Sequence, residues 1–240
     1  MSELSLIGKR ALVTGAGRGI GRVIALALAR ARATVAVTAR TDAELLAVAG
    51  EIEAAGGQAL THPADISDED SVKSLAKHLA SEWGYLDIVV NNAAAFGRGP
   101  LAEMSLATWN RTIATNLTGA FLVTRETIPL LRKAKGGTIA FVSSTAGKRG
   151  YAEGGAYAAS KHGLMGFAHS LLYEVRSDDI RVVVVTPSLV DTRRATGRPV
   201  AASGKGSRLR SEDIADAVLF ACALPGRALV RDIELWATNP

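Results

Sequence analysis

The chain has 240 residues, 48% of them hydrophobic, which is enough to bury one large core, and its net charge of +5 leaves open an anionic partner such as nucleic acid or a phosphorylated cofactor. Its single cysteine, Cys222, excludes an internal disulfide, and no apolar run reaches the roughly 20 residues of a membrane helix. Because the N-terminus also lacks the pattern of a signal peptide, we expect a cytoplasmic protein that does not bind membranes.

Short apolar runs alternate with helical patterns along the chain, which is typical of repeated βαβ units. The runs are nearly continuous, so they predict strands that are covered on both faces, as in a parallel sheet. We therefore expect an α/β fold with one Rossmann-type, doubly wound parallel sheet of about seven strands and helices on both faces. The predicted strands are 11–14, 34–37, 86–90, 138–142, 181–185 and about 229–236.

Capping patterns indicate where helices begin between these strands. Thr41 with Glu44 and Ser67 with Asp70 have the spacing of a capping box, and acidic residues follow Ser211. No domain boundary is evident, so residues 1–240 are expected to form one domain. The predicted helices are about 42–55, 67–82, 109–124, 157–177 and 211–223.

A glycine-rich turn follows the first strand. It reads Thr14-Gly15-Ala16-Gly17-Arg18-Gly19-Ile20-Gly21 and leads directly into a helical run. Such a turn lets a pyrophosphate approach the backbone, where free N–H groups and the positive end of the helix dipole bind it. Because strand, glycine turn and helix follow in this order, we predict a dinucleotide site and not merely a tight turn.

The turn and further motifs resemble the short-chain dehydrogenase/reductase family, in which the glycine pattern is TGxxxGxG. The resemblance implies a hydride-transferring oxidoreductase similar to the 3-oxoacyl-carrier-protein reductases. Ala94 and Ser188 stand where the family usually has glycine, which leaves the geometry of their loops open. The other matching residues span nearly the whole chain: Asp65, Asn91-Asn92-Ala93, Asn116, Ser144, Tyr157-Ala158-Ala159-Ser160-Lys161 and Pro187.

The resemblance also implies which residues contact the cofactor. Asp65 is expected at the adenine, the stretch at Asn91 along the ribose, and the segment after Pro187 at the nicotinamide. The alternatives are a turn residue, a strand-end cap and an ordinary loop. The expected cofactor-binding residues are Thr14, Gly15, Arg18, Gly19, Ile20, Gly21, Arg40, Asp65, Ile66, Asn91, Ala93, Tyr157, Lys161, Pro187, Val190 and Thr192.

The end of the second strand bears on the choice between NAD and NADP. An acid there would bind the ribose 2′-hydroxyl and repel a 2′-phosphate, but this chain has Ala39. Arg40 and Arg18 can instead bind a 2′-phosphate through charge-assisted hydrogen bonds. We therefore predict NADP(H) as the cofactor, with solvated surface arginines as the alternative.

Tyr157 and Lys161 are four residues apart on a predicted helix, so their side chains share one face. We expect the Lys161 ammonium to lower the pKa of Tyr157, so that the tyrosine exchanges a proton with the substrate oxygen. Ser144, after strand 138–142, is expected to hold that oxygen. By resemblance Asn116 is the fourth catalytic residue, whose backbone near a helix distortion holds a water that links Lys161 to solvent. A surface pair and a polar helix residue are the alternatives.

The segment at about 192–210 has several glycines and basic residues but no apolar periodicity, which favours a substrate loop. Its charge could attract an anionic substrate or an acidic carrier protein, and a solvated loop is the alternative. The leading substrate class is a 3-oxoacyl thioester. Another ketone, a steroid, a quinone or a sugar remains open as the carbonyl or alcohol substrate.

A noncatalytic NADP-binding sensor is the alternative from a different class of function, against which the intact set of four catalytic residues argues. A nucleic-acid partner is not expected, because no recognition module accompanies the basic region beyond Arg181. No metal is expected either, since the histidines lack ligand spacing. The resemblance implies a homotetramer or homodimer.

Overall fold

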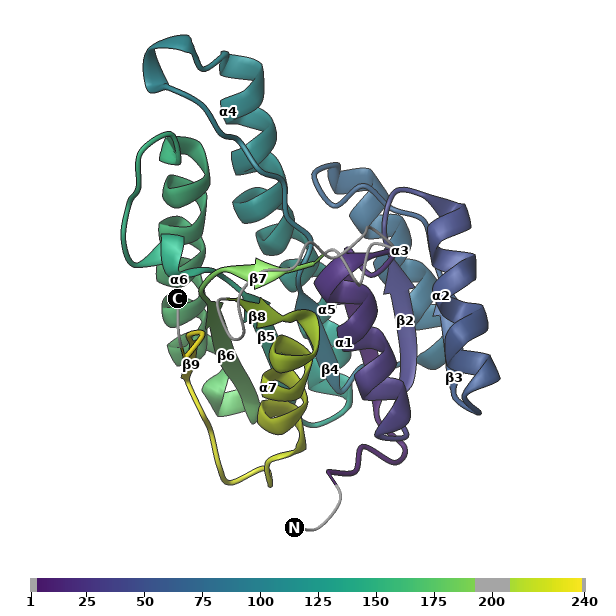
Figure 1. Cartoon of the computed structure of the whole chain (residues 1–240). Coiled ribbons are helices and arrows are strands. Elements are labelled where there is room, and N and C mark those ends of the chain that lie inside the picture. The colour runs from purple at the N-terminus through teal and green to yellow at the C-terminus, as the bar shows by residue number, and fades with distance from the viewer. Residues whose placement is uncertain (1–3, 193–207, 239–240) are drawn as a thin grey trace.

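Seven parallel strands form the central sheet of the computed structural model, which describes residues 4–192 and 208–238 (Figure 1). The strand order is β3-β2-β1-β4-β5-β6-β9, and every neighbouring pair is parallel. The predicted Rossmann-type α/β fold is therefore confirmed. The strands are β1 (Arg10–Thr14), β2 (Thr34–Thr38), β3 (Gln58–Thr61), β4 (Ile88–Asn91), β5 (Gly137–Val142), β6 (Ile180–Pro187) and β9 (Asp232–Leu235).

β3 is the strand that the apolar pattern did not predict. It lies at one edge of the sheet, where it pairs with β2, and none of its four residues is buried. A short edge strand with Gln58 and Thr61 at its ends lacks the continuous apolar run of the inner strands. The six predicted strands are present, and their ends differ from the prediction by up to three residues.

Helices cover both faces of the sheet (Figure 1). One core lies under α1, α2 and α7 and includes Leu28 and Leu45, and the other lies under α3, α5 and α6 and includes Leu79. Successive strand residues point to opposite faces, so Val13 belongs to the first core and Leu12 to the second. The helices are α1 (Gly19–Arg30), α2 (Asp42–Ala54), α3 (Glu69–Trp83), α4 (Leu106–Ile113), α5 (Gly119–Lys133), α6 (Gly155–Val175) and α7 (Ser211–Ala223).

The two expected capping boxes are not formed. Thr41 precedes α2, but its side chain makes no capping hydrogen bond. α3 begins after Asp68, whose carboxylate accepts from the Asp70 N–H at 3.2 Å, while the Ser67 hydroxyl donates to Asp65. The prediction was wrong because Asp65 and Asp68 both lie within two residues of Ser67, and the sequence pattern does not show which side chain turns back toward the helix.

Two short features connect the larger elements near the candidate site. A π-helical turn, Ala114–Thr118, joins α4 to α5 within the helix predicted at 109–124. β7 (Val190–Asp191) pairs with β8 (Leu209–Arg210) at the two ends of the predicted substrate loop. Of that loop, 193–207 lie outside the described residues. No helix in the described part of the chain is long and apolar enough to span a membrane.

Candidate active site

The carboxyl ends of β1, β4, β5 and β6 bring most of the predicted site residues to one edge of the sheet. The strand order reverses between β1 and β4, and open α/β sheets bind ligands at such a point. Thr14 and Asn91 are the last residues of β1 and β4, Ser144 follows shortly after β5, and Pro187 ends β6. We therefore assign the candidate active site to this edge.

The glycine turn packs so closely that side chains are excluded from most of it. A Cβ on Gly15 would lie 2.7 Å from the Ala93 Cα, and one on Gly21 would lie 2.2 Å from the Gly15 carbonyl oxygen. At Gly19, φ is +59°, and apart from its chain neighbours and the backbone of α1 nothing described lies within 4 Å of the Cβ position. The first N–H groups of α1 have no partner within the helix and carry the positive end of its dipole. This cradle fits the pyrophosphate of a dinucleotide.

Thr14 and Asn92 fasten the glycine turn to the end of β4. The Thr14 hydroxyl accepts hydrogen bonds from the N–H groups of Asn92 at 3.0 Å and Ala93 at 3.2 Å. The Asn92 amide donates to the carbonyl oxygens of Thr14 at 3.0 Å and Gly15 at 3.3 Å. Asn92 was missing from the predicted contact residues, although its place beside Asn91 in the same motif was a usable signal.

Two arginines lie near the end of β2, as the cofactor prediction requires. The Arg18 guanidinium is 3.6 Å from a carboxylate oxygen of Glu44, and both side chains are largely exposed. Partial burial opposes ionisation of Asp65, but hydrogen bonds from Ser67 and the charge of Arg40 outweigh it and lower the pKa of that carboxyl. Cationic and anionic groups therefore surround this end of the candidate cofactor site.

Ser144, Tyr157 and Lys161 come together at the end of β5, as predicted. The Ser144 hydroxyl acts on the Tyr157 phenol and opposes the rise of its pKa. Lys161 is only 2% exposed, and its ammonium donates to the Val142 carbonyl oxygen at 2.8 Å. The same Nζ lies 5.8 Å from the centre of the Tyr157 ring. A hydroxyl, a phenol and an ammonium thus meet in one largely buried place.

The pKa expected for Tyr157 is corrected by this geometry. Burial raises the pKa of Tyr157 to about 12, although the Ser144 hydroxyl opposes the rise, and the nearby Tyr151 adds to it. Burial also lowers the pKa of Lys161 to about 8. The expected lowering of the Tyr157 pKa by Lys161 is therefore wrong for the protein alone, because the ammonium points to the Val142 carbonyl and desolvation dominates.

Asn116 lies in the π-helical turn and connects three parts of the site. Its amide donates to the Ala95 carbonyl oxygen at 2.9 Å and the Ser160 hydroxyl at 3.0 Å, and its side-chain oxygen accepts from the Ala95 N–H at 2.7 Å. The Ser160 hydroxyl in turn donates to the Tyr157 carbonyl oxygen at 2.7 Å. The expected helix distortion is present, and the side chain additionally fixes the loop after β4 to α6.

Phe96, in the loop that Asn116 fixes, covers one face of Tyr157. The two rings are stacked with their centres 4.8 Å apart and their planes at 20°, and Phe96 is 71% exposed. An exposed aromatic ring thus packs directly on the proton-donor candidate.

Three buried polar atoms at the ends of neighbouring strands have no hydrogen-bond partner among the described residues. They are Asn91 Oδ1 at β4, Ser143 Oγ after β5 and Thr186 Oγ1 in β6. Buried polar groups are usually hydrogen-bonded, so unsatisfied ones at a ligand-binding edge fit the presence of a polar ligand or ordered water.

The remaining predicted contact residues border the same edge. Ile66 packs on α5, where a Cβ on Gly119 would lie 2.8 Å from its Cδ1. Val190 is half-buried in β7, and Thr192 ends the first described stretch. Pro187 pairs with Leu235 of β9, so the sequence-predicted residues come from both halves of the sheet.

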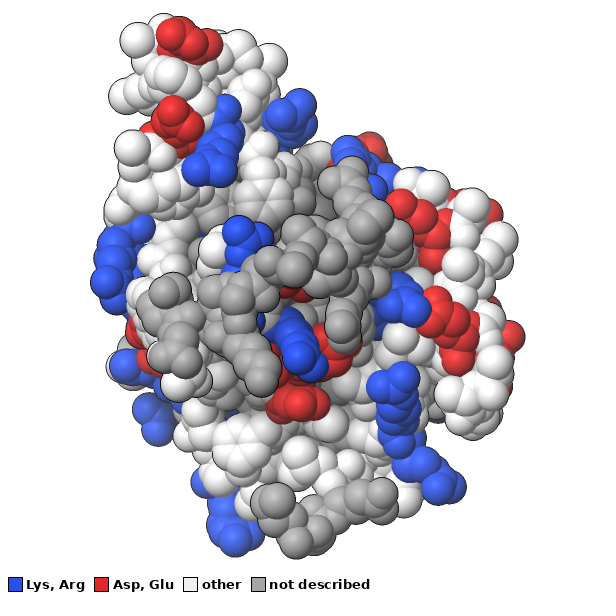
Figure 2. All heavy atoms as spheres, in the orientation of Figure 1, with Lys and Arg blue, Asp and Glu red and all other residues white. Residues whose placement is uncertain are grey.

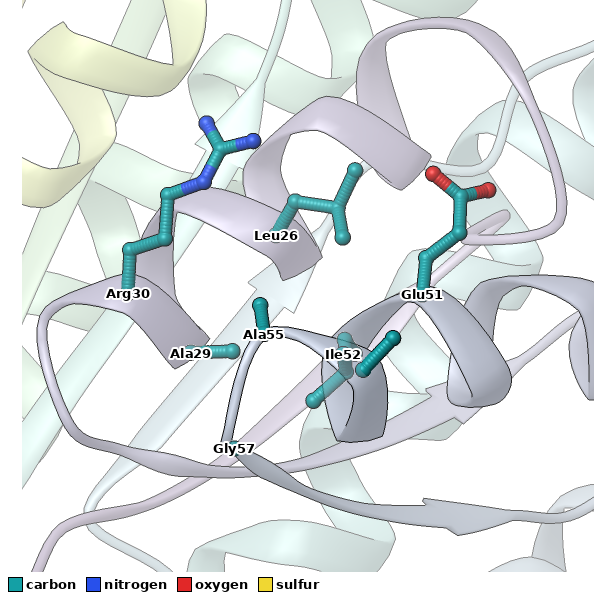
Figure 3. Close-up of a pocket in the computed structure, with 8 residues that line it drawn as sticks. Leu26, Ala29, Arg30, Glu51, Ile52, Ala55 and Gly57 are labelled. Carbon is teal, nitrogen blue, oxygen red and sulfur yellow. The ribbon is translucent and has the colours of Figure 1, made fainter.

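A cavity of about 340 Å³ lies elsewhere, between the C-terminal parts of α1 and α2 (Figure 3). Leu26, Ala29, Ile52 and Ala55 form its apolar wall, and Arg30 stands at its rim. It is at the opposite end of α1 from the glycine turn, so it does not belong to the candidate active site. Within residues 4–192 and 208–238, no group of three or more metal-ligating side chains is found.

A Rossmann sheet that carries a serine, a tyrosine and a lysine at its carboxyl edge defines a class of dehydrogenases and reductases that act on carbonyl and alcohol groups. The model of the short chain dehydrogenase family matches residues 9–199. The chain therefore belongs to this family.

Similar proteins cover the chain broadly. A sepiapterin reductase of Chlorobaculum tepidum is 32% identical over 235 residues, which cover 95% of this chain and 96% of that protein. A 3-oxoacyl-acyl-carrier-protein reductase of Staphylococcus aureus is 38% identical over 183 residues, which cover 76% and 74%. A metagenomic short-chain oxidoreductase, solved in complex with NADP, is 37% identical with a TM-score of 0.85, covering 97% of this chain and 99% of that one.

Proposed function

We propose that the chain is an NADP(H)-dependent oxidoreductase that moves a hydride between nicotinamide and a carbonyl group or secondary alcohol. The observation that carries this proposal is the group formed by Ser144, by the buried Tyr157 whose pKa it influences, and by the buried Lys161 one turn further along α6. It lies at the same sheet edge as the glycine turn, which fits a dinucleotide.

Each of these side chains has a role in proton transfer. The dinucleotide, when bound, supplies or accepts the hydride. The Ser144 hydroxyl holds the substrate oxygen, and the Tyr157 phenol gives that oxygen a proton in reduction or takes it up in oxidation. Lys161 places a positive charge near the phenol, and Asn116 holds α6 and the loop after β4 in register.

The preference for NADP(H) over NAD(H) rests on the end of β2. Ala39 leaves no carboxylate where it would repel a 2′-phosphate, and Arg18 and Arg40 are the cations that would bind it. The similar metagenomic enzyme solved with NADP supports the same assignment. Asp65, with its lowered pKa, is the acid proposed at the adenine.

The substrate class that we propose is a 3-oxoacyl thioester, with another ketone, a steroid, a quinone or a sugar as alternatives. The similarity to a 3-oxoacyl-acyl-carrier-protein reductase supports this class. The exposed rings of Phe96 and Tyr151 give the candidate site an apolar surface on which an acyl chain can pack. An acidic carrier protein is the partner that would deliver such a substrate.

The test follows NADPH and NADH oxidation by the purified protein with 3-oxoacyl thioesters, cyclic ketones, quinones and sugars. Tyr157→Phe removes the phenolic proton but keeps the ring, so we expect turnover to fall by about 10²- to 10⁴-fold while NADPH binding remains. Wild-type turnover in Tyr157→Phe would refute the proposed role of the phenol. Tight NADPH binding without turnover of any substrate would favour a noncatalytic sensor.

We also propose a homotetramer or homodimer in the cytoplasm. Apolar side chains are exposed on α4, α5 and the end of β9, among them Leu106 at 72%, Phe121 at 40% and Trp236 at 47%. Association of copies would cover such side chains. Light scattering measures the assembly directly. The proposed cytoplasmic location is supported by Cys222, a lone buried thiol that has no disulfide partner within the chain.

A further inference from the structure

The glycine turn carries an ion pair that its proposed cofactor contacts do not require. Figure 2 shows acidic and basic side chains next to each other where α1 meets α2. An ion pair joins Arg18, at the start of α1, to Glu44, in the first turn of α2, with 3.6 Å between the nearest nitrogen and oxygen. Among the described residues, Glu44 is the only ion-pair partner of Arg18.

The Glu44 side chain lies close to the backbone of the turn at Gly17. A Cβ built on Gly17 would lie 2.9 Å from the Glu44 Cβ and 2.8 Å from its Oε2. Any larger residue at position 17 would therefore push Glu44 away. The absence of a side chain at Gly17 lets the carboxylate lie directly beside the segment that binds the cofactor in our proposal.

The second arginine of the proposed 2′-phosphate site is differently placed. Arg40 makes no direct ion pair within the described residues, and its charge helps to lower the pKa of Asp65. The Asp65 carboxylate accepts hydrogen bonds from the Ser67 N–H at 2.9 Å and from the Ser67 hydroxyl at 2.6 Å. Asp65 is thus occupied by Ser67, whereas the carboxylate of Glu44 is directed to Arg18.

We infer that Glu44 competes with the cofactor's 2′-phosphate for Arg18 and thereby limits the preference for NADPH over NADH. The inference rests on the proposed function. A carboxylate and a phosphate both draw on the charge and N–H donors of a guanidinium, so Glu44 and a bound 2′-phosphate compete for Arg18. Glu44 also repels a phosphate dianion placed beside it. NADH has no 2′-phosphate, so its binding does not depend on releasing Arg18.

The test compares Glu44→Gln with the wild type and with Glu51→Gln as a matched control. Glu51 lies on the same helix and pairs with Arg22 of α1 through a hydrogen bond of 2.9 Å, so its replacement removes the same charge from the same helix away from Arg18. Calorimetry measures the binding of NADPH, NADH, 2′,5′-ADP and 5′-AMP to each protein. None of these measurements requires turnover.

We expect Glu44→Gln to bind NADPH and 2′,5′-ADP about two- to fivefold more tightly, the range expected when one exposed ion pair no longer competes. NADH and 5′-AMP should bind with unchanged affinity, and Glu51→Gln should match the wild type. The gain should shrink at high salt, which screens exposed charges.

Unchanged NADPH binding by Glu44→Gln would overturn the inference, because Glu44 would then not compete for Arg18. Weaker binding would also overturn it, because it would mean that Glu44 positions Arg18 for the phosphate. An equal gain in Glu51→Gln would also overturn it, since only the net charge would then matter. Failure of all three proteins to bind NADPH would instead refute the proposed function and the inference together.

Discussion

At the scale of single residues, burial acts in opposite directions on the two ionisable side chains of the candidate active site. It raises the pKa of Tyr157 to about 12 and lowers that of Lys161 to about 8, because each charged form loses its hydration. The phenol is therefore protonated at neutral pH, which is the form that a proton donor needs for carbonyl reduction. The protein alone thus favours the donor state of Tyr157.

The lowered pKa of Lys161 predicts a specific dependence of stability on pH. Between about 8 and the ordinary value of 10.5, the unfolded chain holds this proton and the folded chain does not, so the free energy of unfolding rises with pH. Lys161→Met lacks this contribution. We expect the wild type to gain about 2 kcal/mol relative to the variant between about pH 7.5 and about pH 9.5, measured by urea unfolding.

Tyr157 is present in both proteins, so its own ionisation cancels in this comparison. A difference in unfolding free energy that stays constant with pH would show that Lys161 keeps its ordinary pKa in the fold. Such a result would mean that water reaches the ammonium despite its 2% exposure.

At the scale of elements, the glycines of α1 and α2 serve different purposes. Gly21, in the first turn of α1, faces the Gly15 carbonyl oxygen so closely that an added Cβ would lie 2.2 Å from it. Gly50, in the middle of α2, is exposed, and a Cβ there meets nothing within 4 Å. The first glycine is required by packing, whereas the second only adds flexibility to a helix.

Alanine at these two positions should therefore have opposite effects. We expect Gly21→Ala to cost about 1–3 kcal/mol of stability through overpacking and to weaken NADPH binding, because the cradle must shift. Gly50→Ala should stabilise the protein by about 0.5–1 kcal/mol and leave NADPH binding unchanged. Thermal unfolding and calorimetric titration measure both effects. If Gly21→Ala proved as harmless as Gly50→Ala, the turn would be more adaptable than its contacts indicate.

The sequence was informative where a local pattern determines the structure. The inner strands have continuous apolar runs, and the glycine turn lies between a strand and a helix. The positions of these strands and of the turn could therefore be predicted from the sequence. Ser144 could be placed at this edge because it follows a parallel strand, whereas Tyr157 and Lys161 were placed together by their spacing on one helix face and by the family resemblance.

The sequence was uninformative where distant residues decide the outcome. β3 is a polar edge strand that pairs with β2, which precedes it by about twenty residues. The missing cap of α3 has instead a local cause, because Ser67 bonds to Asp65 two residues away and the pattern does not show which neighbour a side chain selects. The hydrogen bonds of Asn116 to Ala95 and Ser160 join residues far apart in the chain. The pKa of Tyr157 likewise depends on burial by several elements, which no local spacing reports.

At the scale of the whole molecule, one arginine ties the last part of the chain to the centre of the sheet. Arg181, at the start of β6, donates to the Thr138 hydroxyl of β5 at 2.7 Å. It also donates to the carbonyl oxygens of Leu224 at 2.9 Å, Cys222 at 3.2 Å and Ala228 at 3.2 Å, at and beyond the end of α7. Although it begins the basic region of the sequence, its charge serves the fold.

Arg181→Met should therefore weaken the fold more than a surface charge change does. Methionine keeps much of the apolar stem but leaves partly buried carbonyl oxygens without their donor, so we expect a loss of about 2–3 kcal/mol in the free energy of unfolding. Arg176→Met, an exposed arginine a few residues earlier, serves as the control and should change stability by less than about 0.5 kcal/mol. Urea unfolding compares the two variants. Equal and small effects would show that water replaces the Arg181 donors and that the connection between α7 and β9 is held by apolar packing alone.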